Sequence, residues 1–223
     1  MIDWQAIDTV MLDMDGTLLD LHFDNYFWSQ HLPARYAEIH GRPFDEVRDQ
    51  LAAQIASHEG SLQWYCLEFW SEALDLDIVA LKQEIQHKIQ IRPHVELFLR
   101  RLREHGKQAM LVTNAHPQSM SLKFELTRID QHLDLIISSH EFQQPKEAQA
   151  FWQQLAAREP FDPARTLFVD DTLRVLDSAR DYGIAHLLAI HQPDSQIQRR
   201  IDQYPAIEHF SEIMPPAKAT AHG

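Results

Sequence analysis

Five short runs of apolar and β-branched residues recur along the chain, and most of them end in polar residues. The apolar positions are nearly continuous rather than alternating, which is typical of strands buried on both faces of a parallel sheet. We therefore predict five buried strands. They cover Ile7–Asp13, Gln108–Asn114, Leu133–Ser139, Thr166–Asp171 and His186–Ile190.

Amphipathic helical patterns precede or separate the later runs. The first opens with Pro93 and closes on Gly106, and the last closes on Gly183, which are ordinary start and stop signals of helices. Alternation of strands and helices predicts an α/β fold built on a doubly wound parallel sheet with right-handed crossovers. The four helices are expected at Pro93–Gly106, Pro117–Ile129, Glu147–Arg158 and Thr172–Gly183.

One interval has no strand-like run. Residues 21–90 carry only helical patterns, and they follow directly after the first strand. About 70 residues of helix are too many for a simple crossover. We expect residues 1–20 and 91–214 to form the catalytic core and residues 21–90 to form a helical cap. The small, polar tail 215–223 is expected to be flexible.

Composition and charge narrow the possible partners. Hydrophobic residues make up 44% of the 223 residues, and 20 Lys and Arg face 33 Asp and Glu, for a net charge of -13. An acidic surface of this kind disfavours nucleic-acid polymers and anionic membranes. The chain has no apolar run long enough to cross a bilayer, its first residues do not resemble a signal peptide, and Cys66 is its single cysteine. We expect a soluble, cytoplasmic protein.

Polar residues gather where the predicted strands end. Ligands of open parallel sheets bind beyond the carboxyl ends of the strands, so these residues are expected to share one site. A loop or cap role would explain any one of them, but not four coincident strand ends. Asp13 and Asp15 follow the first strand, Thr113 and Asn114 the second, and Asp170 and Asp171 the fourth, with Lys146 a few residues beyond the third.

Carboxylates with few neighbouring bases form a hard, oxygen-rich site that suits Mg²⁺. An aspartate held beside such an ion stays ionised and can attack an electrophile, while a second acid can protonate a leaving oxygen. Lys146 and the Thr113 hydroxyl could bind phosphoryl oxygens. Gly16 permits a tight turn that could present backbone amides to a phosphate.

These motifs resemble those of the haloacid dehalogenase-like (HAD) hydrolase superfamily. Its first motif, D-x-D-x-T, corresponds to DMDGT at Asp13–Thr17, and the other three follow in the family's order. The resemblance implies a Rossmann-like core with an inserted C1 cap. It also implies that Asp13 is the nucleophile and Asp15 the general acid and base. Thr113, Asn114 and Lys146 would contact phosphate, and Mg²⁺ would be bound by Asp13, by the Asp15 carbonyl and by Asp171, with Asp170 acting through water.

The sequence departs from the family pattern in two places. The family's lysine motif continues K-P-x-P, whereas Lys146 follows Pro145 and precedes Glu147. Many relatives place a further acid where this chain has Val175, which leaves Asp177 with an expected structural role. The presence of Asp15 argues against a dehalogenase, because carbon–halogen cleavage needs no acid for the leaving group.

Three segments resemble those of the bacterial GMP/IMP nucleotidases of this superfamily: the opening through Trp28, LVTNAHP at Leu111–Pro117 and QWYCLEFWSE at Gln63–Glu72. This resemblance implies a purine 5′-nucleotide as substrate. Most of the rings are expected to pack in the cap, and some could stack on a base. Asp24, Asn25 and His116 are polar candidates for substrate contact. The 14 histidines show no spacing that indicates a zinc site.

Other functions stay open. A phosphatase of sugar phosphates or other small phosphomonoesters would share the same motifs, because the cap sets specificity. A phosphomutase would also use the nucleophile but would keep the phosphoryl group for a second acceptor. A signalling receiver with a phosphorylated aspartate has neither the second acid nor the helical insertion, and a binding-only protein would not need every polar group. The sequence does not indicate an oligomeric state.

Overall fold

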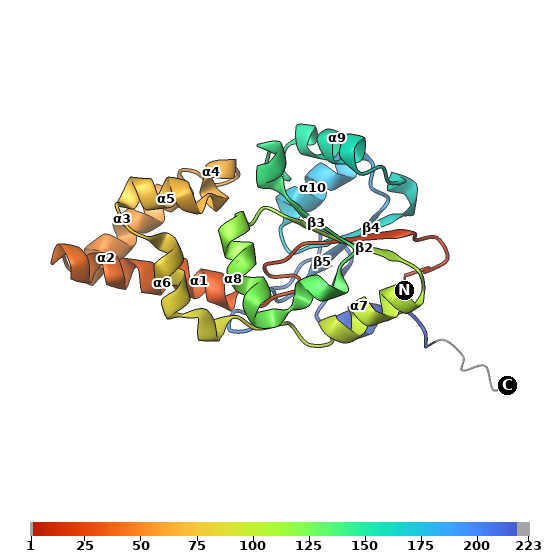
Figure 1. Cartoon of the computed structure of the whole chain (residues 1–223), viewed down its shortest axis with the longest axis horizontal. Helices are drawn as coiled ribbons and strands as arrows, with labels where there is room; N and C mark the ends of the chain where they lie inside the picture. The colour runs from red at the N-terminus through yellow and green to blue at the C-terminus, as the bar shows by residue number, and fades with distance from the viewer. Residues whose placement is uncertain (1, 218–223) are drawn as a thin grey trace.

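A six-stranded, fully parallel sheet forms the centre of the larger part of the molecule (Figure 1). The structure is a computed structural model that describes residues 2–217. The strand order is β3-β2-β1-β4-β5-β6. The strands β2 and β3 lie on one side of β1, and β4, β5 and β6 lie on the other. The strands are β1 Thr9–Leu12, β2 Gln108–Thr113, β3 Leu135–Ser138, β4 Thr166–Asp170, β5 His186–Ile190 and β6 Ala206–Ile207.

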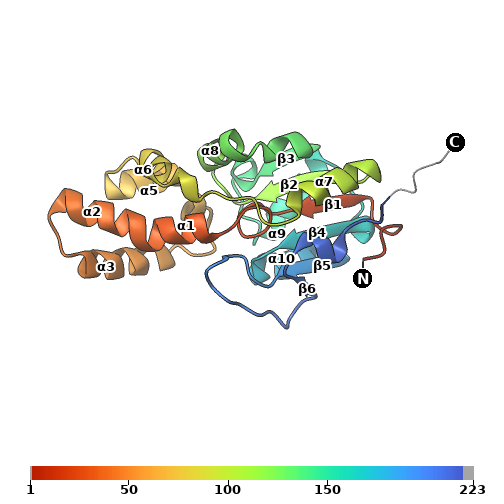
Figure 2. The same ribbon diagram turned by 90° about the horizontal axis from the view of Figure 1, so that it is seen from below.

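Helices cover both faces of the sheet (Figure 2). On one face, α7 (Val95–Glu104) and part of α8 (Pro117–Thr127) pack against β1 and β2. On the other face, α9 (Gln149–Arg158) and α10 (Leu173–Tyr182) bury a second apolar cluster. The strands are apolar on both sides because both sides are covered, which explains the continuous runs in the sequence.

The insertion between β1 and β2 is entirely helical and lies to one side of the sheet (Figure 1). Its side chains form a third apolar cluster of their own, which includes the fully buried Phe27 and Trp70, with Leu122 of α8 added from the core. The elements are α1 His22–Tyr26, a π-helical turn Phe27–His31, α2 Leu32–His40, α3 Phe44–Ala56, α4 Leu62–Tyr65, α5 Leu67–Leu74, α6 Ile78–Glu84 and a 3₁₀ turn Gln86–Lys88.

The two connections to the insertion run side by side. Leu19 pairs with Ile91, the Asp20 amide donates to the Gln90 carbonyl at 2.9 Å, and the Arg92 amide donates to the Leu18 carbonyl at 3.0 Å. The insertion therefore leaves and rejoins the core at one place. The predicted division at residues 20/21 and 90/91 falls at this junction and stays a prediction.

The predicted α/β fold class is confirmed, and the five predicted strands and four predicted helices of the core are present. The sequence did not indicate β6, which has only two residues and pairs with β5 at the sheet edge. The expected flexible tail, 215–223, lies mostly outside the described residues. Within residues 2–217, no helix has both the length and the apolar character that a membrane crossing requires.

Candidate active site

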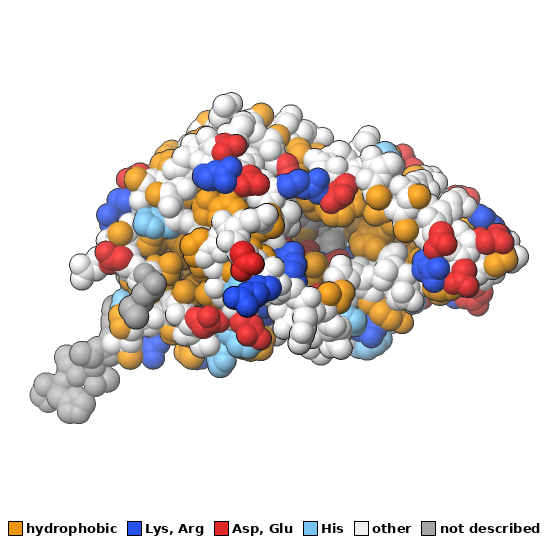
Figure 3. Space-filling view, turned by 180° about the vertical axis from the view of Figure 1, so that it is seen from behind, with side chains coloured by type: hydrophobic (Ala, Val, Ile, Leu, Met, Phe, Trp, Pro, Cys, Tyr) orange, Lys and Arg blue, Asp and Glu red, His pale blue; other side chains and the backbone are white. Residues whose placement is uncertain are grey.

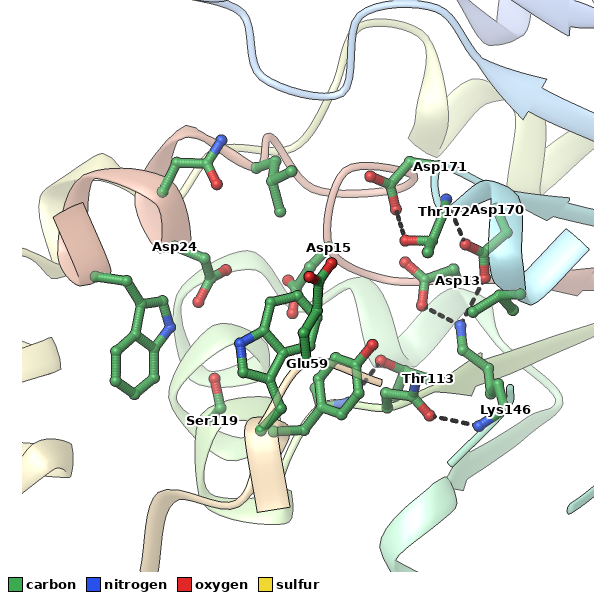
Figure 4. A pocket seen from close by; sticks show the side chains of 18 of the residues that line it. Asp13, Asp15, Asp24, Glu59, Thr113, Ser119, Lys146, Asp170, Asp171 and Thr172 are labelled. Carbon is green, nitrogen blue, oxygen red and sulfur yellow. Dashed lines mark hydrogen bonds and ion pairs between the residues drawn. The ribbon is translucent and has the colours of Figure 1, made fainter. Parts of the chain in front are cut away.

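The acids and hydroxyls of the predicted site lie together at the carboxyl edge of the sheet (Figure 4). Asp13 directly follows β1, and its amide donates to the Val169 carbonyl of β4 at 3.0 Å. Thr113 ends β2 and Asp170 ends β4. Because the three strands are adjacent and parallel, their ends converge as the sequence predicted.

Lys146 joins two of these acids. Its ammonium, almost fully buried, donates to Asp13 Oδ1 at 2.6 Å, to Asp170 Oδ2 at 2.7 Å and to the Val112 carbonyl at 3.0 Å. Burial lowers the pKa of Lys146, but the two carboxylates outweigh it and raise that pKa above its usual value. The lysine is therefore a fixed positive charge beside Asp13.

The loop that carries Lys146 is held by Asn114. The side-chain oxygen of Asn114 accepts the Lys146 amide at 2.9 Å, and its nitrogen donates to Glu147 at 3.0 Å. Glu147 also accepts the hydroxyl of Tyr65, in the helical insertion, at 2.9 Å. Both ends of the Asn114 amide are thus used in positioning the loop, and its direct contact with phosphate stays a prediction.

Three buried carboxylates share one small space. Oxygens of Asp13, Asp170 and Asp171 lie within 4.8 Å of one another. Burial and mutual repulsion raise the pKa of Asp13 to about 7, of Asp170 to about 6 and of Asp171 to about 7, although Lys146 opposes the shift in all three. The three carboxylates carry more negative charge than Lys146 balances. A set of oxygen ligands of this kind suits a hard divalent ion, so the cluster could hold a metal.

Gly16 makes room for this cluster. Its φ is +85°, and a Cβ atom there would lie 2.7 Å from Cγ of Asp171 and 2.9 Å from Cβ of Pro193. The Gly16 amide donates to the Leu19 carbonyl at 2.8 Å. The observed role of Gly16 is therefore to leave space beside Asp171, and the predicted part of its turn in presenting backbone amides to a phosphate stays a prediction.

A second chain of buried charges surrounds Asp15. Lys123 of α8 donates to Asp15 at 2.6 Å and to Asp24 at 2.8 Å, and Lys82 of α6 donates to the other oxygen of Asp24 at 2.7 Å. Burial raises the pKa of Asp15, and the negative charge of Asp24 raises it further. Lys123 lowers this pKa, but the net shift is upward. A carboxyl with a raised pKa is suited to carry a proton.

Asp24 differs from Asp15 because it faces two lysines. Burial raises the pKa of Asp24, but Lys123 and Lys82 outweigh burial, so its pKa is held below the usual value. Both of its oxygens are already bonded to ammonium groups. Asp24 is therefore paired with both lysines, and its predicted contact with substrate stays a prediction.

The acids open onto a cavity of about 500 Å³ between the core and the insertion. The space-filling view shows a hollow there, bordered by hydrophobic side chains (Figure 3). The candidate substrate residues Asn25 and His116 line it, with Asn25 donating to Asp194 at 2.7 Å. The insertion also contributes apolar and aromatic side chains to the lining, and they include Trp28, Ile55, Trp64, Tyr65 and Leu67.

A model of the haloacid dehalogenase-like hydrolases matches residues 7–183. The chain belongs to this family. The matched segment starts just before β1 and ends at the C-terminus of α10, so it includes every strand end that contributes an acid.

Among curated proteins, the chain of this HAD-like hydrolase is 41% identical over 215 residues to the GMP/IMP nucleotidase YrfG of Escherichia coli strain K12. The aligned part covers 96% of this chain and 97% of the relative.

Solved structures share the fold. A HAD phosphatase from Thermococcus onnurineus superposes with a TM-score of 0.75 at 24% identity, over 93% of this chain and 96% of that one. A putative β-phosphoglucomutase from Thermotoga maritima gives a TM-score of 0.66 at 18% identity, over 93% and 97%.

The structure also shows polar residues of this HAD-like hydrolase that the sequence did not single out. Lys82 and Lys123 are buried and hold Asp24 and Asp15, and Glu147 joins Tyr65 to Asn114. Ser119 and Lys123 lie one helical turn apart in α8, which periodicity could have indicated. Lys123 contacts Asp15 and Asp24, which lie more than 90 residues away along the chain. The local sequence pattern therefore could not identify these acids as its partners.

Replacing Asp171 with asparagine should stabilise the metal-free protein. A carboxyl whose pKa is raised by folding costs stability as it ionises, so the wild type should lose stability as pH rises from about 4 to about 7. Removing that charge should raise the free energy of unfolding at about pH 8 by ~2 kcal/mol, or ~4–8 °C in Tm. Thermal unfolding in a chelator measures this.

The same pair of proteins has a built-in control. At about pH 4 and below, where Asp171 is protonated in the folded state and its ionisation in the unfolded state is largely suppressed, the two Tm values should nearly coincide. Added Mg²⁺ should raise the Tm of the wild type much more than that of Asp171→Asn. If the Tm of the variant in chelator at about pH 8 is equal to or lower than that of the wild type, ionised Asp171 does not destabilise the folded protein.

Proposed function

We propose that this protein is a Mg²⁺-dependent phosphomonoester hydrolase in which Asp13 forms an aspartyl-phosphate intermediate. The observation that carries the proposal is the placement of Asp13. Its carboxylate lies at the end of the central strand, 2.6 Å from a buried lysine and beside two further acids, at the base of a cavity that reaches the insertion. Membership of a hydrolase family supports this choice.

The proposed first step is attack of an Asp13 oxygen on phosphorus. A bond forms between that oxygen and phosphorus, and the bond from phosphorus to the ester oxygen of the substrate breaks. Lys146 keeps the Asp13 carboxylate in place and offsets negative charge on the phosphoryl group, which is the main demand of phosphoryl transfer. The buried Thr113 hydroxyl, at the end of β2, faces the same space.

Asp15 would complete both halves of the reaction. Its raised pKa favours the protonated form, which can give its proton to the departing alkoxide. The resulting carboxylate can then take a proton from the water that attacks the aspartyl-phosphate, which returns Asp13 to its free state. Lys123 holds the carboxyl at 2.6 Å and sets the direction in which it points.

The carboxylates of Asp13 and Asp171 and the backbone carbonyl of Asp15 would hold Mg²⁺, with Asp170 acting through water. The buried oxygen donors described above fit this ion. When bound, Mg²⁺ supplies positive charge that lowers repulsion between an anionic phosphate and the acids. Lys146 is already committed to Asp13 and Asp170, so it does not balance all three carboxylates.

We propose purine 5′-nucleotides, GMP and IMP, as the substrates. The identity to a relative named GMP/IMP nucleotidase supports this assignment. The cavity volume is in the range of small-ligand sites, and Trp28, Trp64 and Tyr65 of the insertion add aromatic rings to its lining. A nucleotide with its phosphate at Asp13 would place its base toward these rings.

Residues 21–90 would act as the cap of this enzyme. The paired connections at Leu19 and Ile91 are suited to let the insertion move as a unit over the cavity. Closure would exclude water and bring the aromatic side chains to the substrate. A cytoplasmic location belongs to the same proposal, and it is supported by the single cysteine, which rules out an internal disulfide.

The test is a Mg²⁺-dependent phosphate-release screen over nucleoside monophosphates and sugar phosphates. We expect the highest kcat/KM with GMP and IMP, lower values with pyrimidine nucleotides, and little release without divalent cation. The second candidate, a phosphatase of sugar phosphates, would show the reverse order of kcat/KM. Absence of release from every phosphomonoester would contradict the proposed chemistry.

Trp64→Ala should weaken recognition of the base and leave the rate of phosphoryl transfer unchanged. Stacking of a base on an aromatic ring is worth ~1–3 kcal/mol, so KM for GMP should rise by ~10-fold or more. Ribose 5-phosphate lacks a base, and its hydrolysis by the variant should match that by the wild type. Equal changes for the two substrates would mean that Trp64 serves only the packing of the cap.

A further inference from the structure

A cysteine and two histidines meet at the junction between the insertion and the sheet edge. Ligand atoms of Cys66, His116 and His140 lie within 4.8 Å of one another. Cys66 joins α4 to α5 in the insertion, His116 precedes α8 after β2, and His140 lies in the 3₁₀ turn Ser139–Phe142 after β3. The sequence did not indicate this site because its members are separated by 50 and 24 residues.

The two imidazoles lie against each other, and each turns Nε2 or its ring edge toward a polar neighbour or its partner. Their rings stand edge to face, with centroids 5.0 Å apart. Nε2 of His140 is buried and makes no hydrogen bond within residues 2–217, which is costly for a ring nitrogen. Nε2 of His116 faces the cluster; because Nδ1 accepts the Gln118 amide at 3.3 Å, metal binding through Nε2 would move the ring proton to Nδ1 and give up that long hydrogen bond.

A carboxylate stands next to the three groups. Glu68 lies 3.0 Å from His116 Nε2 and 3.9 Å from the Cys66 sulfur. Thiolate, imidazole and carboxylate are the ligands that Zn²⁺ prefers, and ligand atoms of a tetrahedral zinc site lie roughly 3.3–3.8 Å apart. The side chains would need to approach by about 1 Å, which rotamer adjustments of the exposed Glu68 and the half-buried Cys66 and His140 allow around the buried His116.

We propose that Cys66, His116 and His140 form a binding site for Zn²⁺ or a similar soft divalent ion, with Glu68 as the fourth ligand. This site is separate from the acidic cluster, whose donors are all oxygens and which suits Mg²⁺. An ion bound here would connect the insertion to the carboxyl edge of β2 and β3. The proposal does not depend on the hydrolytic function.

Cobalt is the probe for the test, with Mg²⁺ in excess to occupy the acidic cluster. Wild-type protein titrated with Co²⁺ should show a thiolate-to-cobalt charge-transfer band and the intense visible bands of four-coordinate cobalt, and Zn²⁺ should displace both. Zn²⁺ should also slow the reaction of the single cysteine with a thiol reagent. Absence of the charge-transfer band in the wild type would overturn the proposal.

Cys66→Ser and His140→Ala test the ligands separately, and circular dichroism checks that each is folded. Loss of a residue that only supports a ligand costs ~10–100-fold in metal affinity, so loss of a ligand should cost at least that. His87→Ala is the matched control, since this exposed cap histidine lies outside the cluster, and its Zn²⁺ affinity should equal that of the wild type. Wild-type affinity in both ligand variants would refute the site.

Discussion

Asp13→Asn should abolish phosphate release and leave the fold intact. The amide cannot act as a nucleophile toward phosphorus, so kcat should fall by at least ~10⁴-fold. The structure gives a reason for the fold to survive. Asparagine keeps the shape of the side chain and can still accept from Lys146, and it removes a carboxylate whose burial raises its pKa to about 7. Steady-state hydrolysis of GMP and circular dichroism measure the two outcomes.

Asp181→Asn is the matched control for this substitution. Asp181 is exposed on α10, outside the cavity, and pairs with Arg180 at 3.2 Å. The same chemical change there should leave kcat and KM at wild-type values, because exposed ion pairs contribute little. Turnover by Asp13→Asn near the wild-type rate would remove Asp13 from its proposed role.

Asp15→Asn should have the second-largest effect, and its size should depend on the leaving group. Without an acid at this position, departure of a nucleoside alkoxide should slow by ~10²–10⁴-fold. An activated aryl phosphate leaves without protonation, so formation of the aspartyl-phosphate from it should be nearly unaffected. Single-turnover release of the leaving group from both substrates measures the difference.

Lys123→Met provides a related control. The variant removes the hydrogen bond that orients Asp15 but keeps the carboxyl, so it should show a smaller loss with GMP than Asp15→Asn does. An equal single-turnover loss for GMP and the aryl phosphate in Asp15→Asn would indicate that Asp15 supports the site structurally and donates no proton.

Much of the core follows from local sequence. Continuous apolar runs indicated buried strands, and in a parallel sheet the ends of such strands must share an edge, so Asp13, Thr113 and Asp170 could be placed together in advance. The short strand β6 could not, since two residues carry no periodicity.

The surroundings of the acids were not predictable in the same way. Lys123 contacts Asp15 across 108 positions of sequence, and Lys82 contacts Asp24 across 58. Such pairs depend on how the insertion packs against α8, which is a property of the whole fold. The tight approach of Gly16 to Asp171 is of the same kind, because the sequence shows the glycine but not what it must avoid.

The most direct test is to look for the phosphoryl group on Asp13. Asp15→Asn enzyme in excess should be mixed with an activated aryl phosphate and Mg²⁺, quenched in acid and digested for mass spectrometry. We expect one equivalent of the aryl alcohol in a rapid phase, with the peptide that contains Asp13 heavier by one phosphoryl group. Release of aryl alcohol and inorganic phosphate together, with that peptide unmodified, would contradict covalent catalysis by Asp13.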